Sequence, residues 1–249
     1  TMNRLLTTLL LCLSLPALNA SAADIDPVQL LKKSDQARGG GLPGLSWEIR
    51  SQNGGSRVNE DDPPMRLLIK ASDNASLAET LEPLRSKGAR MLQVERNMWL
   101  TKPGLKKPIP ISPRQRLTGQ AAIGDIAATN YVRDYTPTLL REEKINGENC
   151  YVLELTATNR QATYDKLIYW VSASRNLGVQ AEFNSLSGKK LKSATFEYGN
   201  RVNIQGKAVP FVSRMVISDA LTDATTTLEY SQIVVKAIAA SEFDPSNLE

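Results

Sequence analysis

The chain contains no histidine among its 249 residues. This absence excludes the Ser-His-Asp and Cys-His catalytic systems, because both use an imidazole as general base. It also removes a common zinc ligand. A P-loop is missing too, since Gly188-Lys189-Lys190 lacks the upstream glycine and the following Ser or Thr of that motif. We therefore expect no metal ion and no cofactor.

Cysteine is scarce. The chain has only Cys12 and Cys150, and Cys12 falls in a segment that we expect to be removed. A single remaining thiol allows no internal disulfide, so apolar burial and strand pairing must stabilise the fold. Cys150 stands in a strand-like stretch, Asn149–Leu153, and is predicted to be a small core residue.

Long apolar runs are absent apart from one near the start. Residues 5–18 are mostly apolar, Arg4 precedes them, and the small-residue site Ala20-Ser21-Ala22 follows. This arrangement is typical of a secretory signal peptide and is too short to span a bilayer. We predict a signal peptide over residues 1–22, cleaved near Ala22, and one domain over residues 23–249. The mature protein is then expected to be exported.

Net charge is small, at +4 from 30 basic and 26 acidic residues, and the charges are dispersed. This pattern argues against a nucleic-acid partner. One stretch is locally basic and rich in proline, which favours an extended backbone. It either faces anionic lipid or an acidic partner, at about 1 kcal/mol per cation near a charged membrane, or is a solvated loop. Its cations are Lys102, Lys106, Lys107, Arg114 and Arg116.

Catalysis without histidine has two weak candidates. Ser187 and Lys190 have the spacing of a serine nucleophile with a lysine base, but they lie in a Ser-Gly turn rather than at a helix start. The adjacent carboxylates Asp61-Asp62 and Glu142-Glu143 lie in polar stretches, where neighbouring side chains face water. We predict that the protein is not an enzyme.

Periodicity indicates one helix followed by many strands. Asp26-Pro27 is a helix start, with Val28, Leu30, Leu31 and Ala37 as the apolar stripe and Gly39 after it. Short helical pieces are expected between Ser112 and Asn130. Antiparallel strands with hairpin turns are typical of a meander, a sandwich or a barrel. The predicted strands are Leu45–Arg50, Met65–Ala71, Tyr151–Thr156, Leu167–Val171, Val179–Phe183, Leu191–Tyr198, Val209–Ser218 and Thr225–Val235.

Residues 76–87 are ambiguous. Leu77, Leu81 and Leu84 have helical spacing, but Pro83 would fall inside that helix at a cost of about 3 kcal/mol. Period-two alternation over Leu77–Glu82 is the other interpretation.

A series of short motifs, in this order, resembles the outer membrane lipoprotein-sorting proteins, relatives of the LolA carrier that accompany export pumps of the RND class. The likeness covers nearly the whole mature chain. The motifs include Glu82-Pro83, Lys87-Gly88, Asn97-Met98-Trp99-Leu100, Ser112-Pro113-Arg114-Gln115-Arg116-Leu117, Arg133-Asp134-Tyr135, Tyr164-Asp165 and Trp170-Val171.

The resemblance implies a mainly β fold with covering helices, in which a single curved antiparallel sheet forms an unclosed half-barrel. It makes Leu77–Glu82 a strand. It further implies that the apolar concave face holds the acyl chain of a lipid or lipoprotein, and that an RND-class transporter is the partner. Classical carriers latch the lid with an arginine inside the cavity, for which Arg66, Arg133 and Arg214 are the candidates here.

On this template the strand residues of the concave face form the predicted groove, and the basic segment runs along its mouth. In the hairpin of residues 90–101, Met98 and Leu100 oppose Trp99, so one of its two apolar faces must lie under a covering element. The alternative for each residue is a packed core. The predicted lining residues are Leu92, Val94, Met98, Trp99, Leu153, Leu155, Phe183, Phe196, Tyr198, Met215, Leu228 and Tyr230.

Two functions therefore remain open. The first is a periplasmic carrier that holds an acyl chain and works with a membrane export pump. The second is a lipid-free module that uses the same scaffold, with a solid core, to recognise a protein through the basic segment and residues 112–135. A cavity of several hundred Å³ on the concave face is expected only for the first.

Overall fold

The structure, a computed structural model, describes residues 25–56, 62–127 and 129–248. The predicted signal peptide and Asp61 lie outside the described residues. The helical elements are α1 (Pro27–Gln36), α2 (Ile123–Ile126), α3 (Tyr131–Asp134) and the 3-10 turns η1 (Leu84–Ser86), η2 (Ala240–Phe243) and η3 (Pro245–Asn247). The strands are β1 (Leu45–Gly54), β2 (Arg66–Ala71), β3 (Ala75–Glu82), β4 (Arg90–Val94), β5 (Asn97–Thr101), β6 (Ile109–Ile111), β7 (Arg116–Thr118), β8 (Ala121–Ala122), β9 (Tyr135–Ile145), β10 (Glu148–Ala157), β11 (Lys166–Ser172), β12 (Gly178–Asn184), β13 (Lys190–Glu197), β14 (Asn200–Ile204), β15 (Lys207–Phe211), β16 (Arg214–Asp219) and β17 (Thr225–Val235).

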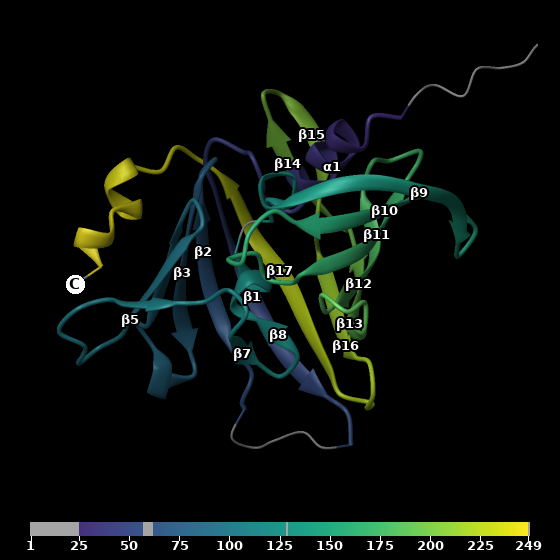
Figure 1. The fold of residues 1–249 in the computed structure, drawn as a ribbon. Coiled ribbons are helices and arrows are strands. Elements are labelled where there is room, and N and C mark those ends of the chain that lie inside the picture. Colours follow the sequence, from purple (N-terminus) through teal and green to yellow (C-terminus); the bar gives the residue numbers. More distant parts are fainter. Residues whose placement is uncertain (1–24, 57–61, 128, 249) are drawn as a thin grey trace, which may run out of the picture.

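Thirteen strands form one antiparallel sheet in the order β6-β5-β4-β3-β2-β1-β17-β16-β13-β12-β11-β10-β9. The sheet curves around its centre without closing, so β6 and β9 remain its two edges (Figure 1). The predicted half-barrel is confirmed. The hairpin β14–β15 and the short pair β7–β8 are separate two-stranded sheets.

Helix α1 begins where the sequence predicts. The Asp26 carboxylate accepts hydrogen bonds from the backbone N–H groups of Val28, at 2.9 Å, and Gln29, at 3.3 Å, which satisfies two of the helix's free donors. Leu30 and Leu31 are buried against the sheet, but Val28 is 44% exposed. The apolar stripe is therefore narrower than predicted.

The ambiguous segment is strand β3, which ends at Glu82 before a cis Glu82-Pro83 bond. One predicted strand needs correction, and five strands were not predicted. The predicted strand Val209–Ser218 is two strands, β15 and β16, because the chain changes sheets at Val212-Ser213. The strands β6, β7, β8, β9 and β14 were not predicted, and β7 and β8 lie where short helical pieces were expected. Most of β9 is exposed, so it lacks the alternation that identifies a half-buried strand.

The register assigns each residue to one face of the sheet, since residues directly opposite each other in antiparallel strands share a face. The inner, concave face carries Ile69, Ala78, Met91 and Leu100 on β2–β5. On the other half it carries Leu153, Tyr169, Ala181, Ala194 and Ile217. Helix α1 packs on this face near β9 and β11, beside α3.

Candidate functional site

Nine of the twelve predicted lining residues belong to the main core cluster or pack against it. Five of them, on β10, β12, β16 and β17, have no exposed surface. The structure therefore places these side chains in the packed interior beneath the concave face, where protein atoms fill the space. The nine residues are Met98, Leu153, Leu155, Phe183, Phe196, Tyr198, Met215, Leu228 and Tyr230.

The other three predicted residues lie on the opposite, convex face. Leu92, Val94 and Trp99 pack with Leu77 and with the C-terminal segment of η2 and η3, through Phe243 and Leu248. Arg90 donates to the carbonyl oxygen of Leu248 at 3.0 Å, which helps to hold this segment in place. The hairpin has two apolar faces, as predicted, but the covering element is the C-terminal segment, and it lies over the outer one.

Aromatic rings fill the concave face between β9 and β13. Tyr164 stacks on Phe183 with ring centroids 4.2 Å apart. Tyr131 of α3 meets Tyr135 and Tyr169 edge to face, each at 5.5 Å. Such ring pairs add to the stabilisation that burial supplies. In this half of the sheet the protein's own side chains complete the core.

A single arginine, Arg38, lies among these rings just after α1. It is 5% exposed, and its guanidinium carbon lies 4.3 Å from the ring centroid of Phe196 and 5.2 Å from that of Tyr131. Its Nη1 atom has no hydrogen-bond partner within the part of the chain that the structure describes. A guanidinium keeps its proton in proteins, so a positive charge lies inside the hollow, held by the faces of two rings.

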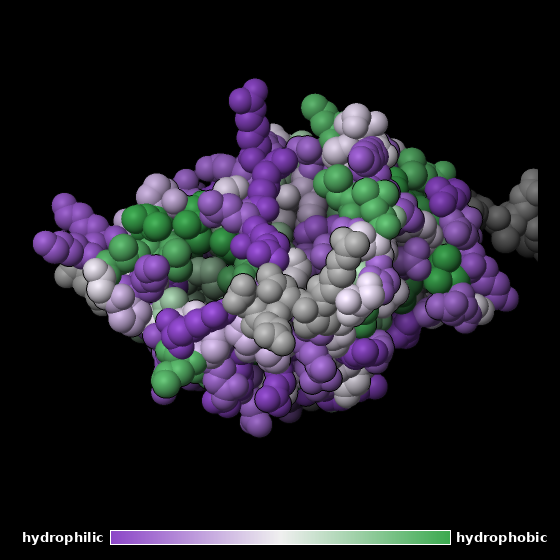
Figure 2. Space-filling model, turned by 90° about the horizontal axis from the view of Figure 1, so that it is seen from below, coloured by the Kyte–Doolittle hydropathy of each residue, from purple (hydrophilic) through white to green (hydrophobic). Residues whose placement is uncertain are grey.

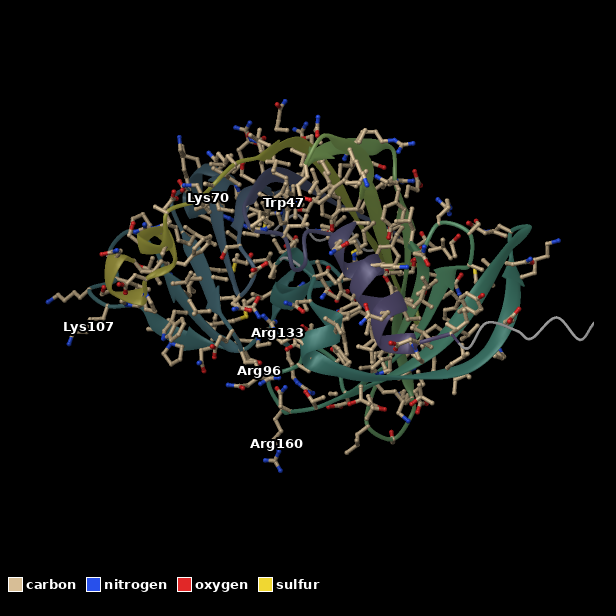
Figure 3. The ribbon with its side chains drawn as sticks, turned by 90° about the horizontal axis from the view of Figure 1, so that it is seen from above. Trp47, Lys70, Arg96, Lys107, Arg133 and Arg160 are labelled. Atoms are coloured by element: carbon tan, nitrogen blue, oxygen red, sulfur yellow. The ribbon has the colours of Figure 1, made fainter. Side chains whose placement is uncertain are left out.

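None of the three candidate latch arginines occupies this position. Arg66 and Arg214 pair with Glu82, at 3.2 Å, and Glu197, at 3.1 Å. Arg133 pairs with Asp134 at 2.7 Å, and Arg96, its neighbour in Figure 3, donates to its carbonyl oxygen at 3.0 Å. Arg38 was missed because it stands at the end of an amphipathic helix before three glycines, where a cation is ordinarily a surface residue.

Asp35 connects α1 to α3. Its carboxylate is 2% exposed and accepts a hydrogen bond from the backbone N–H of Val132 at 2.9 Å. Burial raises the pKa of Asp35 to about 8, although the Val132 bond and the positive charge of Arg38 act in the opposite direction. The carboxyl group is therefore mostly protonated at pH 7.

An open groove of about 350 Å³ lies on the inner face of the other half of the sheet, at the edge where β3 ends and β4 begins. Figure 2, seen from below, shows a hollow lined in green on the side of these strands. The groove walls combine seven apolar residues with five polar ones, of which Thr80 is buried. The apolar residues are Pro63, Met65, Pro83, Ala89, Met91, Leu100 and Leu117, and the polar ones are Asp62, Thr80, Arg85, Ser86 and Arg116.

One wall of the groove is the segment that contains β7, and a polar network fixes it to the sheet. The Asp62 carboxylate accepts from the Thr118 hydroxyl at 2.9 Å, from the Gly119 N–H at 2.6 Å and from Arg116 at 3.2 Å. Gly119 has φ +47°, and a Cβ atom there would lie 2.0 Å from the Asn53 side-chain oxygen. Only glycine allows this close approach.

The predicted basic segment divides into two parts. Arg116 lines the groove, and Lys102 lines an adjoining hollow of about 540 Å³ that shares Arg85, Ser86, Ala89 and Leu100 with it. Arg114 forms an ion pair with Asp165 at 2.8 Å. Lys106 and Lys107 are exposed, and Lys107 projects away from the body of the protein (Figure 3). Only part of the segment therefore borders the groove.

The weak catalytic candidates occupy ordinary surface positions. Ser187 shares a hydrogen bond with Ser185 at 2.9 Å in an exposed turn, and Lys190 pairs with Glu182 at 3.2 Å. Glu143 pairs with Arg141. Cys150 is buried on the outer face with Val152 and Trp170, as predicted for a core residue. Within residues 25–56, 62–127 and 129–248, no cluster of acidic and cysteine side chains is arranged to hold a metal ion.

Comparison with known proteins identifies the family. A LolA superfamily protein from Nitrosomonas europaea is 33% identical, with a TM-score of 0.78, over 88% of this chain and 98% of its own. The chain belongs to the LolA superfamily. A family model described as an uncharacterized protein matches residues 72–249, and no curated protein matches the sequence.

Two further solved structures share the LolA-like fold. A domain from Vibrio parahaemolyticus named for outer membrane lipoprotein sorting is 20% identical, with a TM-score of 0.72, over 89% of this chain and 97% of its own. A DUF1329 family protein from Desulfovibrio piger is 19% identical, with a TM-score of 0.72, over 90% of this chain and all of its own. In the described part of this chain, no helix has the length and apolar character to cross a bilayer.

Proposed function

We propose that this LolA-like protein is a non-enzymatic periplasmic carrier that holds one acyl chain of a lipid or lipidated protein in the groove lined by Met65, Met91, Leu100 and Leu117. Its trafficking role would be toward the outer membrane, in partnership with an export pump of the RND class. The observation that carries the proposal is the groove itself, which has an apolar majority of lining residues, is open at one edge of the sheet and is bordered by Arg85 and Arg116.

The size of the groove suits a single chain. Its volume of about 350 Å³ lies near the lower end of the roughly 300–1,000 Å³ range of ligand pockets. Each buried methylene contributes about 0.8 kcal/mol, so about six of them contribute about 5 kcal/mol. The arginines at the rim suit an anionic group at the end of the chain. The methionines Met65 and Met91 adapt to cargo of variable shape.

The test is binding of a fluorescent fatty-acid probe, combined with mass spectrometry of lipid extracted from the purified protein. Leu100→Trp should fill the groove and reduce probe affinity at least tenfold. Leu140→Trp places the same ring on the exposed edge strand β9 and should leave affinity unchanged. Absence of extracted lipid together with absence of probe binding would reject the carrier in favour of the lipid-free recognition module.

A further inference from the structure

The three most exposed large apolar side chains of the described residues lie in turns at one edge of the sheet. Leu84 is 84% exposed, and Leu186 and Leu221 are each 81% exposed. They occupy the turns that follow β3, β12 and β16. These three strands run in the same direction in the antiparallel sheet, so the three turns lie at the same end of the strands. We call this end of the sheet the mouth edge, because the groove also opens there.

The opposite edge has a different composition. Its turns between β2 and β3, β4 and β5, and β9 and β10 consist of Ser72–Asn74, Glu95-Arg96 and Asn146-Gly147. None of these contains a large apolar residue, and Leu177, in the turn between β11 and β12 at the same edge, is only 4% exposed. Exposed leucine is therefore a property of the mouth edge and not of the turns in general. Burying such side chains in a second apolar phase is favourable in proportion to the area removed from water.

Cations lie beside two of the three leucines at the mouth edge. Arg85 and Lys87 flank Leu84, Lys189 and Lys190 follow Leu186, and Lys102 begins the turn after β5; all five are exposed, and Lys190 pairs with Glu182 at 3.2 Å. The acidic residues beside Leu221 are engaged in turn hydrogen bonds, because Asp219 accepts from the Leu221 and Thr222 N–H groups and Asp223 accepts from Ser56. Figure 2 shows green and purple groups interspersed over this face.

Backbone and side-chain bonds connect the turn of Leu221 to its neighbours at the mouth edge. The Ala220 N–H donates to the Leu191 carbonyl oxygen at 3.1 Å, which connects the turn of Leu221 to the strand that follows Leu186. Ser56 donates to Asp223 and connects the β1 end to the same turn. The turn of Leu84 also forms a wall of the groove, through Pro83, Arg85, Ser86 and Ala89.

We propose that the mouth edge docks on the surface of an anionic phospholipid bilayer, with Leu84, Leu186 and Leu221 inserted among the acyl chains and the lysines against the headgroups. Exposed apolar groups combined with adjacent cations are the two determinants of peripheral membrane binding. Docking in this orientation brings the entrance of the groove to the lipid. The inference rests on the proposed function for what enters the groove, but the contact itself is tested separately.

The experiment is co-sedimentation of the chain beginning at Ala23 with vesicles of 70% phosphatidylcholine and 30% phosphatidylglycerol. This chain includes every described residue and omits the predicted signal peptide, whose apolar run would bind lipid by itself. The triple variant Leu84→Ser, Leu186→Ser and Leu221→Ser should lose at least a hundredfold in partition coefficient. Lys87→Glu with Lys102→Glu should lose about twentyfold, and this loss should shrink in high salt.

Matched controls on other surfaces should bind as the unchanged chain does. Leu140→Ser removes an exposed leucine from β9, and Lys207→Glu reverses a charge on the β14–β15 hairpin. Failure of the unchanged chain to sediment with these vesicles, or full binding by the triple variant, would overturn the proposal. The triple variant should still bind the fatty-acid probe. Leu100→Trp should sediment normally without binding the probe, so failure of the carrier function is distinguishable from failure of docking.

Discussion

The two halves of the curved sheet differ in how completely side chains fill their concave faces. Between β9 and β13 the concave face carries Tyr169, Phe183 and Phe196, and α1 and α3 lie over it. Between β2 and β5 the same face carries the smaller Thr80 and Ala78 beside Met91 and Leu100, and it leaves a groove of about 350 Å³. Ring size and helical cover therefore decide which half is solid and which is open, because a close-packed interior leaves few voids of this size.

The largest expected effect on the free energy of unfolding comes from removing a large side chain from the packed half of the sheet. Phe183→Ala removes a fully buried ring that stacks on Tyr164 and should lower the free energy of unfolding by about 3–5 kcal/mol. Leu100→Ala at the groove should lower it by only about 1 kcal/mol, because that side chain already borders an opening. Urea denaturation of both variants measures the difference. Equal losses would contradict the division into solid and open halves.

The outer face supplies the next test. Leu92 has no exposed surface and packs beneath the C-terminal segment, so Leu92→Ala should lower the free energy of unfolding by about 2–4 kcal/mol. The affinity for a fatty-acid probe should not change, because the side chain points away from the groove. A several-fold loss of probe affinity in the folded variant would contradict this assignment and would show that Leu92 contributes to ligand binding.

Much of the fold was predictable, because its signals are local. The N-cap at Asp26, the alternation in β1, β2 and β10–β12, and the proline after β3 each determine the conformation of a short segment. The strand β9 was not predictable, because an exposed edge strand such as Tyr135–Ile145 lacks a buried face and hence an alternating pattern.

The site was less predictable, because it depends on which face of each strand is covered and by what. Alternation assigns Leu92 and Trp99 to one face and Met91 and Leu100 to the other, but it does not identify the concave face. The C-terminal segment decides that question by covering the outer one. Similarly, no local pattern shows that the cation of Arg38 lies between two rings that come from α3 and β13.

The solid half should also respond to pH. An unfolded Asp35 loses its proton near its ordinary pKa of 3.8, whereas the folded carboxyl keeps it to about pH 8. The folded state therefore binds more protons between these values, and the free energy of unfolding should fall as pH rises through this range. Asp35→Asn should flatten the profile and stabilise the protein relative to the unchanged chain at pH 8.

Chemical denaturation from pH 5 to 9 provides the measurement. Glu142→Gln, on the exposed strand β9, is the matched control and should follow the unchanged protein. A profile for Asp35→Asn that is as steep as that of the unchanged protein would show that Asp35 does not hold its proton in the fold.

The smallest effect is expected at the rim of the groove. Arg116 is exposed and pairs with Asp62 at 3.2 Å, and exposed ion pairs contribute about 0–1 kcal/mol to stability. Arg116→Gln should therefore leave the unfolding midpoint nearly unchanged. If the guanidinium receives the anionic end of a bound chain, affinity for a fatty-acid probe should fall about threefold to tenfold, while affinity for the matching fatty alcohol should stay constant. Arg201→Gln, on the distant β14–β15 hairpin, should change neither. Equal losses of affinity for the acid and the alcohol would mean that Arg116 contributes to the shape of the groove wall but does not bind the carboxylate. Any preference for the acid would then come from other residues at the rim.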